Sequence, residues 1–155
     1  MRKKDKEITG PGRIWDILAR GEVLHLGLWD GRRPYVVPVN YACGEGTLYL
    51  HSSRKGKKAL VLAEHPEICA AVIREPKPCG FTAHFQSVIG YGRAVIVEDQ
   101  AEKMLGLTLL MRHYGSDKSE FPREIVDKTL VVRIDIDSMT GKCSPAPAGG
   151  VPGRP

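Results

Sequence analysis

Alternation of apolar and polar residues is the dominant pattern in this sequence, and it predicts a chain built mainly from β-strands. The alternation covers residues 22–29 and 34–42 on either side of Asp30-Gly31, and it returns over 47–52 after a second glycine-containing turn. Successive side chains of a strand point to opposite faces, so each segment predicts a strand with one buried face. Because the turns between them are short, we expect three antiparallel strands in succession. Further strands are predicted over residues 67–74, 81–98 and 129–138.

Other stretches follow the 3.6-residue period of an α-helix instead. The strongest is 101–114, whose polar residues Glu102, Lys103, Arg112 and His113 lie away from its apolar stripe. A basic segment over 53–64 predicts a short helix that ends before His65-Pro66. Residues 9–21 predict another short helix, and 122–128 predict one helical turn.

Proline and glycine mark irregular places near the predicted strands. Pro76 and Pro78 predict a loop after residue 74, because proline has no N–H to donate to a sheet. Gly90 and Gly92 interrupt the strand over 81–98 and predict a bulge or a bend. Strands joined largely by short turns, with a few helices, predict a mainly β fold: a small β-barrel with peripheral helices.

The chain has 155 residues, which is a usual length for one domain. We expect a single domain over residues 1–144 and a disordered tail over 145–155, because the last fifteen residues hold four prolines and four glycines. The charged N-terminal segment lacks the apolar core of a secretory signal, and no apolar run approaches the ~20 residues that cross a bilayer. These features predict a cytoplasmic protein with reduced thiols and no membrane partner.

The net charge and the spacing of the cysteines limit which ligands, metals and macromolecules we expect the protein to bind. Lysine and arginine number 23 against 18 aspartate and glutamate, which gives a net charge of +5. Because acidic residues alternate with basic ones along most of the chain, we expect no nucleic-acid partner, whereas a small anionic ligand fits. The four cysteines contain no C-x-x-C pair, and the sequence predicts no metal site.

Residues 51–58, HSSRKGKK, form the strongest candidate for a binding site. They connect a predicted strand to a predicted helix, whose N-terminus is electropositive because its first N–H groups have no acceptor in the helix. Four added cations are unfavourable there unless an anion neutralises them. This favours a phosphate group held by N–H groups, serine hydroxyls and lysines. A solvated basic turn capped by serine is the alternative interpretation.

Pro38 lies in the middle of the predicted strand over 34–42. A mid-strand proline gives up a ladder hydrogen bond and leaves neighbouring backbone groups free, which suits a flat ring with polar edges. The alternative is that Pro38 only marks an edge strand. The fragment GYGR at 90–93 lacks the third glycine of a dinucleotide-binding fingerprint, so classical nicotinamide binding is not expected.

Several motifs occur in a fixed order along the chain. They are RPYVVPVNY at 33–41, LYLHS at 48–52, GKK at 56–58, SVIGYGRA at 87–94 and LMRHY at 110–114. Together they resemble the nitroimidazole-resistance branch of the pyridoxamine 5'-phosphate oxidase-like flavoproteins. The segments RIDI at 133–136 and MTGK at 139–142 are similar to the last strand of that family. One departure is Cys79-Gly80-Phe81, where the family motif reads Cys-Gly-Trp.

This resemblance implies an FMN-binding split β-barrel that forms a homodimer, with FMN, or sometimes FAD, at the subunit interface. It implies a flavin ring that runs along the backbone of Val37, Pro38, Val39 and Asn40. The ribityl chain is then expected beside His51, Ser52 and Ser53, and the phosphate beside Lys57 and Lys58. Ser87 matches a segment offered near the flavin, from the same or the other subunit.

The motifs lead to the hypothesis of an FMN-dependent oxidoreductase that reduces nitroimidazole-type or similar small electron acceptors. His51 matches a histidine regarded as an active-site residue in the resistance proteins, and we expect it to donate a proton as a nitro oxygen leaves. The alternative hypothesis is a flavin- or haem-binding sensor or electron carrier without a substrate of its own. Five histidines provide candidate haem ligands, and their spacing favours none of them.

Overall fold

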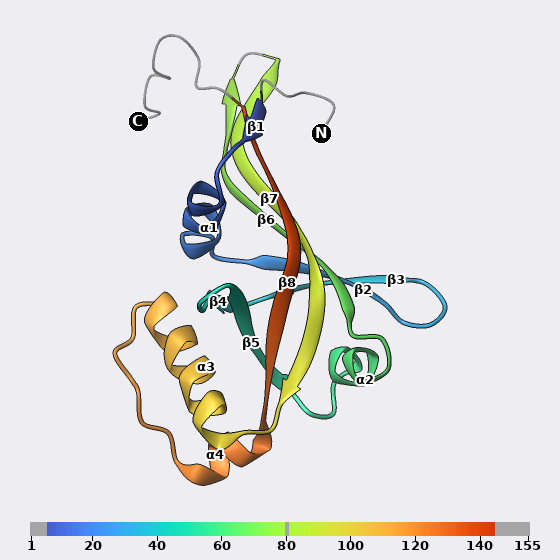
Figure 1. Cartoon of the computed structure of the whole chain (residues 1–155), viewed down its shortest axis with the longest axis vertical. Helices are drawn as coiled ribbons and strands as arrows, with labels where there is room; N and C mark the ends of the chain where they lie inside the picture. The colour runs from blue at the N-terminus through green and yellow to red at the C-terminus, as the bar shows by residue number, and fades with distance from the viewer. Residues whose placement is uncertain (1–5, 80, 145–155) are drawn as a thin grey trace.

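The computed structural model describes residues 6–79 and 81–144, so Gly80 and the tail predicted over 145–155 lie outside the described residues. Figure 1 shows one long curled sheet with helices around it. The strands are β1 (Glu7–Ile8), β2 (Leu24–Trp29), β3 (Pro34–Val39), β4 (Tyr41–Cys43), β5 (Thr47–Ser53), β6 (Glu67–Cys79), β7 (Thr82–Val97) and β8 (Thr129–Cys143). The helices are α1 (Pro11–Ala19), α2 (Lys57–Glu64), α3 (Gln100–His113) and α4 (Arg123–Lys128).

Asn40 joins the two ends of the sheet. The strand predicted over 34–42 is two strands, because β3 pairs with β2 whereas β4 pairs with β5. In the order β3-β2-β6-β7-β8-β5-β4, these two halves are the first and the last strand. The antiparallel sheet therefore curls round to meet itself at Asn40. The mainly β fold and the split β-barrel predicted from the sequence are confirmed.

The loop predicted at Pro76 and Pro78 is wrong, because β6 continues through both prolines to Cys79. Its pairing with β7 shifts between Arg74 and Lys77 and then resumes, with Pro78 opposite Ala83. Pairing of β6 with β2 covers only residues 69–71, so beyond them one edge of β6 is open within the described residues. An open edge and a bulge are the places where a strand tolerates proline.

The bulge predicted at Gly90 or Gly92 is confirmed, since the register of β7 against β8 shifts between Tyr91 and Gly92. A Cβ on Gly92 would overlap the backbone carbonyl oxygen of Asp135 on β8. Only glycine allows this close approach of the two strands. The bulge thus bends β7 where it crosses the barrel.

The described helices match the predicted ones, but α2 begins only at Lys57, because Ser53 ends β5 and residues 54–56 form a turn. The placement of Lys103 on the polar side of α3 is wrong, since its side chain is only 2% exposed. α3 packs on a small apolar cluster that includes Tyr49, Leu107 and Val131. The aliphatic stem of Lys103 is buried there, while its Nζ lies 3.8 Å from an oxygen of the exposed Glu98.

The C-terminal end of α3 holds the chain where β4 begins. The hydroxyl of Tyr114 accepts a hydrogen bond from the N–H of Tyr41 at 3.2 Å and donates one to the carbonyl oxygen of Glu22 at 2.6 Å. Nε2 of His113 lies 2.7 Å from the carbonyl oxygen of Gly21. Tyr41 is fully buried, and its hydroxyl donates to the carbonyl oxygen of Leu18. These bonds fix the loop before β2 against the start of β4.

We expect Gly92→Ala to destabilise the fold by about 2–3 kcal/mol, because the new methyl group meets backbone that cannot move aside. Urea denaturation measures the free energy of unfolding. Gly12→Ala in α1 is the matched control, since a Cβ there meets nothing within 4 Å. Equal losses of stability in the two variants would contradict the close approach at Gly92.

Tyr114→Phe should lower the free energy of unfolding by about 1–2 kcal/mol, because the N–H of Tyr41 and the carbonyl of Glu22 both lose their partner. Tyr91→Phe is the control, since Tyr91 is 56% exposed. Thermal unfolding of the two variants compares them. A Tyr114→Phe protein as stable as the control would show that water replaces the hydroxyl at no cost.

Candidate functional site

The basic turn connects β5 to α2 and forms the first half of the candidate site. Gly56 precedes the first turn of α2, and no side chain caps the free N–H groups of that turn. The hydroxyl of Ser53 accepts a hydrogen bond from the N–H of Lys55 at 3.2 Å, which folds the turn back on itself. The uncapped helix start and its added cations form an arrangement that can accept an anion.

Lys57 is already balanced by a carboxylate. Its Nζ lies 2.7 Å from Oδ2 of Asp30, in the turn between β2 and β3, and 4.5 Å from the centre of the Tyr35 ring. The hydrogen bond from Lys57, followed by the N–H of Arg33, lowers the pKa of Asp30 to about 2. Of the two lysines predicted to hold a phosphate, Lys57 is therefore the one already paired within the protein.

Lys58 is half-buried, and no described residue offers it a carboxylate. Partial burial lowers the pKa of Lys58, because its charge loses water without gaining a counterion. Arg54, by contrast, lies 3.9 Å from Glu98. Lys58 is thus the cation of the turn that gains most from an added anion.

His51 lies on β5 just before the turn. Partial burial lowers its pKa, and the charge of Lys58 lowers it further. The imidazole of His51 is therefore neutral at pH 7. The neighbouring Ser52 is half-buried and Ser53 is exposed, so both serines line the approach to α2.

The second half of the site is β3. Val39 is buried and Val37 half-buried on the core side, whereas Pro38 and Asn40 are exposed on the outer side. β3 pairs with β2 alone, so its other edge has no strand partner among the described residues. The sequence indicated either free backbone groups beside Pro38 or an edge strand. Because β3 is an edge strand with one unpaired edge, the two interpretations agree.

The two halves meet at Asn40. Tyr41 pairs with Leu50, so the antiparallel register brings Asn40, one residue earlier, beside His51, one residue later. Both side chains lie on the outer face, away from the core. The structure thus brings Val37, Pro38, Val39 and Asn40 together with His51, Ser52, Ser53, Lys57 and Lys58.

Ser87 does not join this cluster within one chain. It lies on β7 opposite Ile73 of β6, and the strand β2 separates β6 from β3. Two strands, β6 and β2, therefore lie between the strand that carries Ser87 and β3, which leads to Asn40.

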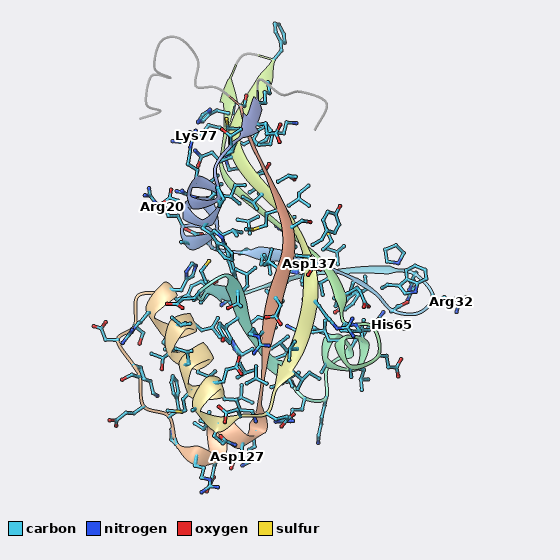
Figure 2. All side chains as sticks on the ribbon, viewed as in Figure 1. Arg20, Arg32, His65, Lys77, Asp127 and Asp137 are labelled. Atoms are coloured by element: carbon cyan, nitrogen blue, oxygen red, sulfur yellow. The ribbon has the colours of Figure 1, made fainter. Side chains whose placement is uncertain are left out.

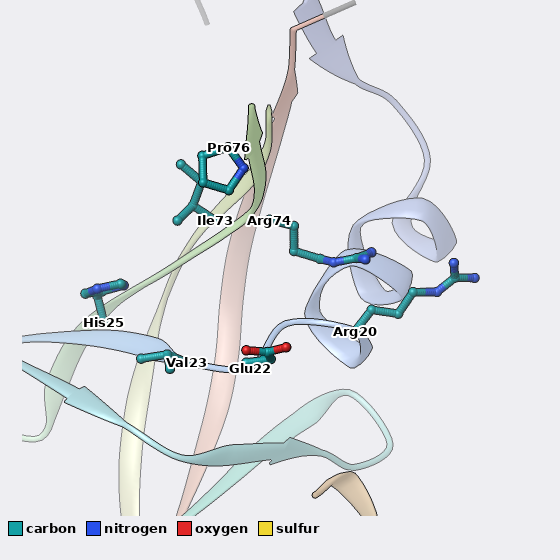
Figure 3. Close-up of a pocket in the computed structure, with 7 residues that line it drawn as sticks. All are labelled: Arg20, Glu22, Val23, His25, Ile73, Arg74 and Pro76. Carbon is teal, nitrogen blue, oxygen red and sulfur yellow. The ribbon is translucent and has the colours of Figure 1, made fainter. Parts of the chain in front are cut away.

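A pocket on the outer face next to β3 was not predicted from the sequence (Figure 3). We call it the β2–β6 pocket. Its volume is about 330 Å³, and its lining residues are Arg20, Glu22, Val23, His25, Ile73, Arg74 and Pro76. The lining comes from two separate segments, residues 20–25 and 73–76, which only the pairing of β2 with β6 brings together. The Asp30 carboxylate that pairs with Lys57 was likewise taken from the sequence only as a turn residue.

The outer face of the sheet carries exposed apolar side chains. Val36 is 62% exposed, Tyr91 56% and Ile89 43%. Val36 on β3 pairs with Gly27 on β2, which also pairs with Cys69 on β6. Cys69 in turn pairs with Tyr91 on β7. Val36 and Tyr91 therefore lie in one row that crosses four strands. Figure 2 shows side chains projecting outward along this part of the sheet.

Other chemistry in the described part of the chain is limited. Residues 6–79 and 81–144 contain no group of three or more His, Cys, Asp or Glu side chains able to hold a metal ion. None of the helices there is long and apolar enough to cross a membrane. Cys43 is half-buried, and burial raises its pKa to about 11, so its thiol stays protonated at neutral pH.

Comparisons with known proteins agree with this fold. The family model "Pyridoxamine 5'-phosphate oxidase" matches residues 11–143. A Bacteroides thetaiotaomicron structure named for 5-nitroimidazole antibiotic resistance is 30% identical, with a TM-score of 0.81 over 88% of this chain and 85% of that one. No curated protein sequence matches the chain.

Two less similar structures share the fold. An FAD-binding protein of Mesorhizobium loti is 21% identical, with a TM-score of 0.70 over 88% of this chain and 96% of that one. An FAD- and haem-binding protein of Mycobacterium smegmatis is 19% identical, with a TM-score of 0.78 over 96% of this chain and 77% of that one. Family match, fold and ordered motifs agree: the chain belongs to the pyridoxamine 5'-phosphate oxidase-like split-barrel family.

Proposed function

We propose that this protein binds FMN and uses it to reduce small electron acceptors of the nitroimidazole type. The observation that carries the proposal is the N-terminus of α2, which no side chain of the described residues caps, together with Lys58, which has no carboxylate partner among those residues. A flavin phosphate fits this turn, because helix N–H groups and a partly desolvated lysine together favour a dianion.

Residues of β3 and β5 would hold different parts of FMN. The backbone of the segment Val37 to Asn40 would run along the ring, and the carbonyl and N–H groups that face the free edge of β3 can hydrogen-bond to its polar rim, with no donor at Pro38. Ser52 and Ser53 follow along β5 and can bind ribityl hydroxyls. Bound flavin supplies the electrons, whereas these residues orient the ring and exclude water from one side of it.

His51 is proposed as the proton donor. It lies between the edge of β3 and the turn. The form that can give a proton to an acceptor oxygen is the imidazolium, and a bound flavin phosphate would favour this form because its negative charge raises the pKa of His51. His51→Ala tests the role separately from binding: a variant with full flavin content and unchanged turnover would remove His51 from the mechanism.

A homodimer is proposed on the outer face of the sheet. Exposed apolar side chains in one contiguous row, such as Val36 and Tyr91, are typical of an interface. Two strands lie between the strand that carries Ser87 and β3, so a ring that lies against Asn40 would contact Ser87 of a second copy rather than of its own chain. Sedimentation of the protein with and without FMN measures this assembly.

The first test is flavin binding, read as quenching of FMN fluorescence on titration with the purified protein. We expect saturation near one FMN per chain. Lys58→Ala should weaken binding about 10- to 100-fold, because a charge-assisted phosphate contact is lost. Lys57→Ala should weaken it less than about fivefold, since the Lys57 charge is already balanced by Asp30.

Mass analysis of any chromophore that copurifies separates FMN from FAD, and an absorption spectrum reveals haem by its Soret band. An anaerobic assay with a nitroimidazole and chemically reduced FMN-loaded protein then tests the reaction. A protein that takes up neither FMN nor FAD would overturn the proposal. Flavin uptake without any turnover would favour the sensor or electron carrier.

A second expectation concerns the pH titration of His51. In the free protein its imidazole should titrate below the ordinary value of 6.5, because burial and the Lys58 charge both disfavour the imidazolium. A bound phosphate dianion should raise the pKa of His51, since it favours the charged form. NMR of the His51 ring with and without FMN measures both values. In Lys58→Ala the pKa in the free protein should already be higher.

A further inference from the structure

One edge of β8 has a gap between two partner strands. Figure 1 shows β1 beside the upper part of β8 and β5 beside its lower part. β5 pairs with residues 129–135 and β1 with residues 141–142, so residues 136–140 have no strand partner on this edge within the described part of the chain. The opposite edge of β8 pairs with β7. Backbone groups of the gap therefore face a space between the ends of β1 and β5.

A glycine turns the chain away at each end of this gap. Gly10 (φ +100°) lies between β1 and α1, and Gly46 (φ +69°) comes directly before β5. A Cβ on either residue would meet nothing within 4 Å, so both glycines border open space. A strand added to β8 here would run into β1 at one end and β5 at the other. The gap therefore suits a small molecule rather than an extended peptide.

Asp137 lies in the gap, at the bulge between β7 and β8. Gly92 of β7 pairs with Ile136. The preceding residue, Tyr91, pairs with Ser138, so Asp137 has no partner on β7. Its side chain is exposed, and no described residue forms an ion pair or a hydrogen bond with its carboxylate. The negative charge of Asp137 is therefore uncompensated among the described residues.

A pocket between α1 and β8 includes this carboxylate, and we call it the α1–β8 pocket. Its volume is about 430 Å³. The apolar part of its lining comes from Pro11, Ile14 and Trp15 of α1 and from Ile136 and Met139 of β8. Asp137 is the only charged residue that lines it. The pocket thus combines an apolar and aromatic wall with one free negative charge.

The α1–β8 pocket is separate from the proposed flavin site and from the proposed dimer face. Ile14 of α1 is buried in the main core cluster together with Val88. α1 therefore covers the core side of the sheet, whereas Tyr91 is exposed on the outer face. His51 lies near the far end of β5 from Gly46. A ligand in the pocket needs neither a flavin nor the exposed row at Tyr91.

The chemistry of the lining suits a small organic cation. An ammonium group only donates hydrogen bonds, and the carboxylate of Asp137 and the carbonyl groups on the open edge of β8 only accept them. Trp15 adds an indole, which is the aromatic group that attracts a cation most strongly. The apolar side chains suit an apolar body attached to the ammonium group.

From this geometry we propose that the α1–β8 pocket binds a small primary amine with an aromatic or other apolar body. The ammonium group would bind to Asp137 and the open edge of β8, and the body would lie against α1. A pocket of about 430 Å³ is at the small end of ligand sites, which suits a compound with one ring.

The test is calorimetric titration of the purified full chain with benzylamine, which is protonated at pH 7, and with benzyl alcohol as the uncharged control of similar shape. We expect benzylamine to bind about five- to tenfold more tightly, because the carboxylate and the indole each favour a cation. Asp137→Asn should reduce this difference to about twofold by weakening benzylamine alone. Asp117→Asn removes an exposed carboxylate in the loop after α3 and should leave both affinities unchanged.

Trp15 reports where the amine binds. The chain has two tryptophans, so Trp29→Phe leaves Trp15 as its only indole. Trp29 is 47% exposed, and we expect its replacement to leave the fold intact. In this variant, benzylamine should change the fluorescence of Trp15 over the same concentrations at which calorimetry measures binding.

Three results would overturn the amine site: no binding of benzylamine, equal affinities for benzylamine and benzyl alcohol, or benzylamine binding that Asp137→Asn leaves unchanged. Benzylamine binding without a change in Trp15 fluorescence would place the amine elsewhere and would overturn the site as well. Since Asp137 is exposed, Asp137→Asn should fold, and urea denaturation verifies this. The titrations use protein without added flavin, so their outcome is independent of the proposed function.

Discussion

The passage of the chain through Asn40 is the constraint on which both the barrel and the candidate site depend. Before Asn40 the backbone pairs with β2, and after it the backbone pairs with β5, so the sheet closes at this residue. A buried N–H at such a switch needs a partner outside the sheet, and the hydroxyl of Tyr114 provides it for Tyr41. The same hydroxyl binds the carbonyl of Glu22. Barrel closure and the wall of the β2–β6 pocket are therefore set by one side chain.

Electrostatics explains why the basic turn is stable without a ligand yet favours one. Lys57 is paired with Asp30, and Arg54 lies near Glu98, so part of the repulsion at the start of α2 is cancelled. Glu98 also lies 3.8 Å from the buried Lys103 of α3, which links the turn to the helix that supports β5. Lys58 has no such partner among the described residues. The remaining repulsion lies where an anion would relieve it, and together with the larger effect of partial burial it lowers the pKa of His51.

Local patterns were sufficient for the strands and helices but not for contacts made across the sheet. Alternation predicted β2, β5 and β8, and the helical period predicted α3. Nothing local indicated that β6 has an open edge beyond residue 71, so its prolines were taken for a loop. Lys103 was placed on a polar face because the apolar cluster under α3 is built from β5, β7 and β8, far away in sequence. The pairing of Asp30 with Lys57 depends on the same long-range register.

Pro38 had two interpretations from the sequence, a marker of an edge strand and a source of free backbone groups, and the structure makes them compatible. β3 has only β2 as a partner, so its outer edge is open to pairing with another chain. Proline in that strand removes one donor and makes such pairing unfavourable. The backbone groups that β3 directs to this open edge are then free for a ligand that does not need a full ladder. Protection of an edge and binding of a flat, polar-rimmed ring thus require the same residue at the same place.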